Sequence, residues 1–139
     1  MRRVYLWDTS VFLTWIRGES RGQERDLALA AAVEDVDTGR AAIVASVMIF
    51  CEMLESHLRD EEPRQRFADV FRRPNMQLVE VSSAIARRAG QIRDSCRALG
   101  IVCPRSEDAI HVATAVVYGV SELHTFDEHQ LKPMVRCLW

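Results

Sequence analysis

Short apolar runs and longer helical patterns alternate along this chain of 139 residues. The apolar runs are brief and mostly rich in residues that favour β-structure, so they are predicted to be buried strands. These strands are expected at residues 3–7, 41–45, 76–81, 122–125 and 135–138. Helices are expected after residue 8, over 23–38, after Ser46, from Pro63 to Arg73, from Ser82 or Ser83 to Leu99, and from Ser106. The order predicts parallel strands joined by helical crossovers.

The fold class predicted from this order is α/β, a three-layer α/β/α sandwich with a central, mainly parallel sheet. Residues 1–139 are expected to form a single domain, because the length fits one ordinary domain. Apolar residues make up 48% and charged residues 27%, as in soluble globular proteins. No apolar run approaches the roughly 20 residues of a membrane span, and the acidic Asp8 argues against a signal peptide. We therefore expect no membrane association and a cytoplasmic location.

The four cysteines and four histidines do not form a pattern typical of zinc binding. No C-x-x-C pair is present, and the histidines are scattered relative to the cysteines. Cys51 is expected in the core. Buried or idle thiols are favoured over a disulfide framework.

Asp8 directly follows the first predicted strand and precedes a helix. Aspartate at this place commonly caps the helix with its side chain. Thr9 or Ser10 could cap the helix instead, so the sequence leaves both a capping and a functional role open for Asp8.

Asp108 lies in the first turn of a helix that is apolar on most sides. Ser106 is a good N-cap for this helix, and only two residues between 109 and 117 are polar. Free backbone N–H groups and the helix dipole stabilise a carboxylate in the first turn. Asp108 is therefore either a simple first-turn acid or part of a site.

Glu52 lies in the apolar helix predicted to follow Ser46. The core stripe of this helix is expected at positions 47, 50, 51, 54 and 58, which leaves Glu52 beside the stripe. Its neighbours Met48, Ile49 and Met53 are apolar too, so a carboxylate here needs a partner. A solvent-facing role and a functional role are both open.

Four acids can reach one edge of the predicted sheet. The crevice of a parallel sheet lies beyond the carboxyl ends of its strands. Asp8 and Asp127 directly follow strands, whereas Glu52 and Asp108 lie on helices that can start at the same edge. Clustered carboxylates raise one another's pKa unless a cation is present. Oxygen ligands without a histidine or cysteine cluster favour Mg²⁺ or Mn²⁺ over zinc.

Four stretches, in order over nearly the whole chain, resemble the PIN domain (PilT N-terminus) family, closest to small prokaryotic VapC-type toxins. The stretches are Val-Tyr-Leu-Trp-Asp8-Thr-Ser, Ser46-Val-Met-Ile-Phe-Cys-Glu52, Glu107-Asp108-Ala-Ile-His-Val-Ala-Thr-Ala115 and His124-Thr-Phe-Asp127. The resemblance implies a metal-dependent ribonuclease with a central parallel sheet.

By position, the resemblance implies an acidic catalytic and metal site made by Asp8, Glu52, Asp108 and Asp127. Ser10 and Thr125 would be its polar support. His111 is expected to have a structural role, because a metal ion activates water without an imidazole base. Glu107 is either an accessory ligand or exposed to solvent.

The implied partners are an RNA substrate, a second copy in a homodimer and, for a toxin, an antitoxin protein. The antitoxin is expected to lay a helix in a groove near the first three helices. The first alternative is a catalytically silent RNA-binding or adaptor module with the same fold. The second is a structure-specific DNA nuclease, although the chain has no evident helical clamp or long basic arch for threading DNA.

Overall fold

The structure is a computed structural model that describes residues 2–53, 55–129, 131 and 134. Its strands are β1 (Arg3–Trp7), β2 (Ala41–Ser46), β3 (Met76–Val79) and β4 (Glu122–His124). Its helices are α1 (Thr9–Arg17), α2 (Gln23–Asp37), α3 (Ile49–Glu52), the 3₁₀ turn η1 (Glu55–Leu58), α4 (Glu61–Val70), α5 (Ser83–Ala98) and α6 (Ser106–Tyr118).

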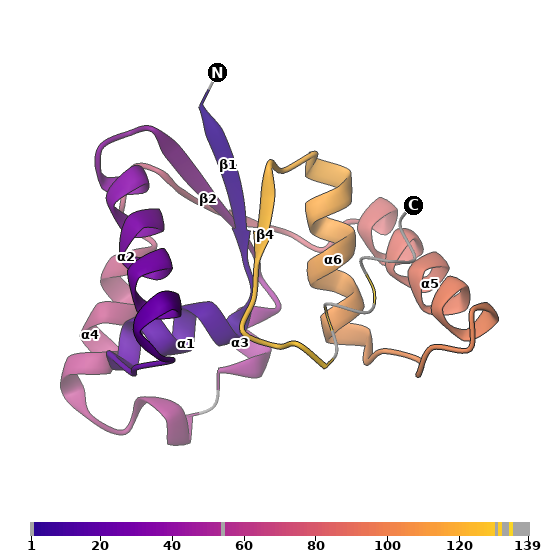
Figure 1. Cartoon of the computed structure of the whole chain (residues 1–139), viewed down its shortest axis with the longest axis horizontal. Helices are drawn as coiled ribbons and strands as arrows, with labels where there is room; N and C mark the ends of the chain where they lie inside the picture. Colours follow the sequence, from indigo (N-terminus) through magenta and orange to yellow (C-terminus); the bar gives the residue numbers. More distant parts are fainter. Residues whose placement is uncertain (1, 54, 130, 132–133, 135–139) are drawn as a thin grey trace.

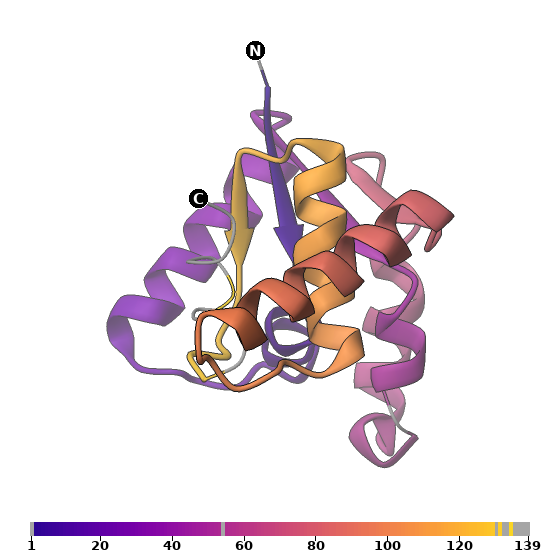
Figure 2. The ribbon, with the colours of Figure 1, turned by 90° about the vertical axis from the view of Figure 1, so that its right-hand side faces the viewer.

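The four strands form one parallel sheet in the order β3-β2-β1-β4, with helices on both faces (Figures 1 and 2). Helices α1, α2 and α4 cover one face, and α5 and α6 cover the other. This arrangement confirms the predicted three-layer α/β fold. The strand predicted at 135–138 lies outside the described residues.

A separate apolar core lies on each face of the sheet. On the first face, Trp7, Phe12 and Ile16 are fully buried together with residues of α2 and α4. On the second face, Val112 of α6 packs with Ile92 of α5. Burial of such side chains contributes about 1.5–3 kcal/mol each. The helices that carry functional side chains are thereby fixed against the strand ends.

Strand register brings the carboxyl ends of β1 and β4 together. Trp7 pairs with His124, and the backbone N–H of Asp8 donates to the carbonyl of His124 at 3.3 Å. The residues that follow the two strands, Asp8 and Thr125, therefore leave the sheet side by side.

The segment after β2 differs from the prediction. Ser46 is the buried last residue of β2, and its hydroxyl accepts the N–H of Met48 instead of capping a long helix. The helix α3 spans only Ile49–Glu52. The helix begins later than predicted, and the buried residues here are Ile49 and its C-cap Met53, one turn apart. The predicted core stripe is wrong at positions 50 and 51, whereas Leu58 packs against the core and position 54 lies outside the described residues.

Two residues of that stripe lie on the surface. Phe50 is 48% exposed, and the Cys51 thiol is exposed as well, so the prediction that Cys51 belongs to the core is wrong. Composition alone suggested burial because nearly every residue around them is apolar.

Helix starts are partly as predicted. Ser82 caps α5 through a bond from Ile85 N, and Asp8 caps α1 through a bond from Val11 N. At α6 the N-cap position belongs to Arg105, without a side-chain cap bond, so the prediction of Ser106 as the cap is wrong. Among the described residues, no helix has both the length and the apolar character to cross a bilayer.

Candidate active site

Asp8 is held at the end of β1 by three hydrogen bonds. Its Oδ1 accepts from Ser10 Oγ at 2.6 Å and from Val11 N at 3.2 Å, and its Oδ2 accepts from Thr125 Oγ1 at 2.5 Å. Asp8 is thus both a helix cap and the centre of a polar cluster that joins the ends of β1 and β4. The two residues predicted as polar support, Ser10 and Thr125, both contact it directly.

Burial raises the pKa of Asp8 above its ordinary value. The hydroxyls of Ser10 and Thr125, the charge of His111 and the N–H of Val11 act in the opposite direction. Ionised Asp8 at this buried position therefore lowers the free energy of unfolding of the metal-free protein. Because the pKa of Asp8 is higher in the folded than in the unfolded state, this destabilisation is absent below the unfolded-state pKa. It grows as pH rises through the folded-state pKa.

Asp8→Asn is expected to stabilise the metal-free protein at neutral pH. Asparagine keeps an oxygen for Ser10 and Val11 but carries no buried charge, so we expect a gain of about 1 kcal/mol, or roughly 3 °C in Tm. At an acidic pH below the ordinary aspartate pKa the difference shrinks, because Asp8, whose pKa is raised, is then protonated in the folded state as well. Thermal melts in EDTA at both pH values measure it, with exposed Asp94→Asn as the matched control. A Tm below that of wild type at neutral pH would contradict this electrostatic account.

Glu52 lies between α1 and α6. Its Oε1 accepts from Thr9 Oγ1 at 3.0 Å and lies 2.5 Å from Nε2 of His111. Its side chain is 20% exposed, whereas His111 is buried. Burial alone would raise the pKa of Glu52, but the bonds and charge of its neighbours outweigh it, so the pKa is lowered. Glu52 therefore favours its ionised form.

Asp108 is buried in the first turn of α6, and Arg105 Nε donates to its Oδ2 at 2.9 Å. The pKa of Asp108 is raised, chiefly by burial and also by the charges of Asp127 and Glu52, against the lowering effect of Arg105. These like-charge effects reach Asp108 from the end of β4 and from α3. The acidic groups therefore lie close enough to repel one another.

Asp127 follows β4 in a tight polar turn. Its backbone N–H donates to Thr125 Oγ1 at 2.9 Å, and its Oδ1 accepts from the N–H of His129 at 3.0 Å. Thr125 thus connects Asp127 to Asp8, since the same hydroxyl group donates to Asp8. The turn also approaches Ser10, whose Oγ accepts the N–H of Phe126 at 3.0 Å.

Asp8 and Asp127 therefore share the Thr125 hydroxyl at the ends of β1 and β4, and Glu52 contacts α6 at His111, one turn after Asp108. Within the described ranges, however, no three Asp, Glu, His or Cys side chains form a group with the spacing of metal ligands. Asp108 bonds Arg105 and Glu52 bonds His111, so these carboxylates turn toward cationic or hydrogen-bonding partners. Glu107, expected to be either an accessory ligand or exposed to solvent, is half-buried next to Asp108 in the sequence.

Two residues of this cluster are not predicted from the sequence. The sequence indicates only a capping role for Thr9, yet its hydroxyl donates to Glu52. Nothing in the predicted site includes Arg105, yet it pairs with Asp108. The spacing of Arg105, three residues before Asp108 at the start of a helix, could have indicated this ion pair, because side chains three residues apart lie on the same turn.

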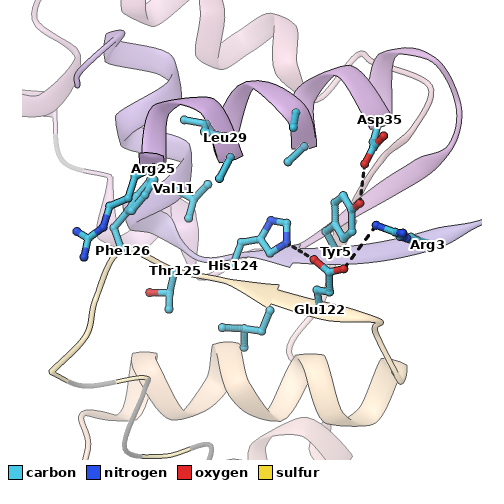
Figure 3. Close-up of a pocket in the computed structure, with 14 residues that line it drawn as sticks. Arg3, Tyr5, Val11, Arg25, Leu29, Asp35, Glu122, His124, Thr125 and Phe126 are labelled. Atoms are coloured by element: carbon cyan, nitrogen blue, oxygen red, sulfur yellow. Dashed lines mark hydrogen bonds and ion pairs between the residues drawn. The ribbon is translucent and has the colours of Figure 1, made fainter. Parts of the chain in front are cut away.

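A cavity of about 530 Å³ lies between α2 and β4, beside the acidic cluster (Figure 3). Tyr5, Leu29 and His124 are among its lining residues, and Tyr5 Oη donates to Asp35 at 2.9 Å. None of the four predicted acids is among the described residues that line it, although Thr125 connects it to Asp8. The acidic cluster therefore lies outside this cavity.

Comparisons with solved structures find the same fold in bacterial proteins. VapBC2 from Rickettsia felis, bound to a DNA fragment from its promoter, has a TM-score of 0.70 at 13% identity over 93% of this chain and 91% of that chain. FitAcB from Neisseria gonorrhoeae has a TM-score of 0.64 at 17% identity, over 94% and 93%. VapC20 from Mycobacterium tuberculosis, described as a toxin that cleaves the sarcin–ricin loop, has 0.57 at 14%, over 89% and 90%.

No curated protein sequence matches the chain. The PIN domain family, in contrast, matches residues 5–133, which include the last three residues of β1, all four predicted acids and the turn after β4. Since this match extends over most of the sequence and agrees with the parallel sheet, the chain belongs to the PIN domain family.

Proposed function

We propose that the chain is a metal-dependent endoribonuclease that hydrolyses RNA phosphodiesters, and that it is the toxin of a toxin–antitoxin pair. The observation that carries this proposal is the approach of acids from separate elements: Thr125 joins Asp8 to Asp127, and Glu52 contacts His111, one turn after buried Asp108 on α6. Membership of the PIN domain family supports it. So does the fold shared with a toxin described as cleaving the sarcin–ricin loop.

The donor set fits Mg²⁺ or Mn²⁺. Asp8, Glu52, Asp108 and Asp127 would hold the ion, and all of them offer carboxylate oxygens. The charges of Asp127 and Glu52 raise the pKa of Asp108, and a divalent cation would relieve this repulsion. When bound, the ion would polarise the phosphodiester, lower the pKa of water and neutralise developing charge.

The neighbouring side chains would orient these acids for that task. The hydroxyls of Ser10 and Thr125 fix both oxygens of Asp8, and Thr9 and His111 fix Oε1 of Glu52. Arg105 balances the charge of Asp108. Its side chain is 61% exposed, so it can leave Asp108 for a phosphate or for solvent without breaking buried packing.

An antitoxin partner is supported by an aromatic surface near α3 and α4. Half-exposed Phe50 contacts the rings of Phe67 and Phe71, with centroid distances of 5.8 and 5.6 Å. Exposed aromatic clusters are typical of protein interfaces. We infer that an antitoxin helix lies near α1, α2 and α3, and that the toxin acts as a homodimer in the cytoplasm.

The test is cleavage of an end-labelled structured RNA by the purified chain with Mn²⁺ or Mg²⁺ and, in parallel, with EDTA. Metal-dependent internal cleavage is the expected result. RNA binding without cleavage under any of these conditions would favour the silent adaptor module. Cleavage of branched DNA with intact RNA would favour the structure-specific DNA nuclease. Either of these two results would contradict the proposed ribonuclease.

A further inference from the structure

A second cavity, of about 380 Å³, adjoins the acidic cluster. Ser10 and Asp127 line one part of it, and these residues belong to the proposed active site. Arg21 and Arg25, from the loop before α2 and from its first turns, line another part. Phe126, which lies between Thr125 and Asp127 in the sequence, also lines this cavity. A ligand in this cavity would therefore contact the cluster and two arginines together.

The basic side chains are available and oriented. The side chains of Arg21 and Arg25 are 39% and 47% exposed. The Arg21 guanidinium lies over the ring of Phe126, 5.4 Å from its centroid, while its Nε donates to Thr14 Oγ1 at 3.1 Å. Figure 3 shows Arg25 and Phe126 together at the end of the larger cavity nearest this site. Guanidinium groups beside an aromatic ring are typical of nucleotide recognition.

Glu128 pairs with Arg25 across the cavity. Both side chains are about half exposed, so this ion pair contributes little to stability and costs little to separate. The carboxylate occupies the donors that a phosphate would use, because carboxylate and phosphate both bind guanidinium in a bidentate manner. Glu128 therefore competes with an anionic ligand for Arg25.

We propose that this cavity, lined by Arg21, Arg25, Phe126 and Glu128, binds a nucleotide of single-stranded RNA next to the scissile bond. Its phosphate pairs with Arg21 and Arg25, and Phe126 supplies the flat apolar wall. The volume lies in the range of small-ligand sites. The inference rests on the proposed ribonuclease, because it places the nucleotide relative to that acidic cluster.

The test is fluorescence anisotropy of a labelled single-stranded RNA with the full chain in EDTA, where metal-dependent cleavage does not occur. Arg25→Gln and Arg21→Gln should each weaken binding about tenfold and lower the salt dependence by about one unit of slope. Glu128→Gln should strengthen binding several-fold, because it frees Arg25.

Two control variants, one on α4 and one just after it, distinguish a local site from a general effect of charge. Arg72→Gln removes an exposed arginine paired with Asp69, and Glu62→Gln removes an acid paired with Arg66. The charge changes equal those in the cavity, so similar effects in both places would overturn the proposal. Absence of RNA binding by the wild-type chain would also overturn it.

The outcome is distinct from that of the ribonuclease test. If the chain cleaves RNA with Mn²⁺ but Arg25→Gln behaves like Arg72→Gln, the nucleotide site is wrong and the nuclease stands. If the cavity variants change binding as expected but no metal supports cleavage, the RNA site stands and the nuclease is wrong.

Discussion

Replacing Asp108 with asparagine is expected to lower metal-dependent RNA cleavage by at least about 10³-fold. The substitution preserves shape but removes one of the carboxylates that would hold the ion. A bound metal contributes several kcal/mol of transition-state charge stabilisation, and about 4 kcal/mol corresponds to three orders of magnitude. Initial cleavage rates on one end-labelled RNA, at saturating Mn²⁺, measure the change.

The control for this variant is Asp94→Asn, an exposed acid on α5 with the same chemical change. It is expected to cleave like wild type. Asp108→Asn should stay folded, because burial already disfavours the charged form of this side chain. Near-wild-type cleavage by a folded Asp108→Asn protein would remove Asp108 from the site.

His111→Ala is expected to destabilise the fold by about 3 kcal/mol, which lowers Tm by roughly 10 °C. The imidazole is 1% exposed, and its Nε2 lies 2.5 Å from Glu52. Alanine leaves a cavity where the imidazole was, which weakens the packing. It also removes a hydrogen-bonding partner of the largely buried Glu52 carboxylate, which leaves that charge less stabilised. Thermal melts and denaturant titrations measure the loss.

His111→Gln is the matched variant, since its amide keeps a donor for Glu52 and fills part of the space. We expect it to recover about half of the lost stability. Below its melting temperature, His111→Ala should retain cleavage within about tenfold of wild type, because a metal ion activates water without imidazole. A Tm within 2 °C of wild type, or complete loss of cleavage by a folded protein, would contradict the structural role of His111.

The overall fold followed from sequence because its signals are local and consistent. The apolar runs and the helical patterns between them required parallel strands with crossovers, and the structure confirms this order. Asp8 was placed correctly for the same reason, since it directly follows β1. Its contact with Thr125 required only that β1 and β4 be neighbours.

The region around Glu52 was harder to predict because nearly all of its residues are apolar. With so little polar contrast, periodicity does not fix where a short helix begins, and a shift of two residues moved Phe50 and Cys51 to the surface. The partners of Glu52 and Asp108 depend on tertiary contacts across many residues, such as His111 against Glu52. Such long-range contacts produce no characteristic residue spacing, so they cannot be predicted from a single sequence.

The metal site is tested most directly by calorimetric titration of Mn²⁺ into the wild-type chain and into Asp8→Asn, Asp108→Asn and Asp94→Asn. We expect saturable binding to wild type and to Asp94→Asn, and at least about tenfold weaker binding to the other two. Loss of a residue that only supports a metal ligand lowers metal affinity about 10–100-fold, and loss of a ligand itself should cost at least as much. Equal Mn²⁺ affinity in all four proteins, or no binding to wild type, would contradict a metal site made by acids from separate elements of the fold.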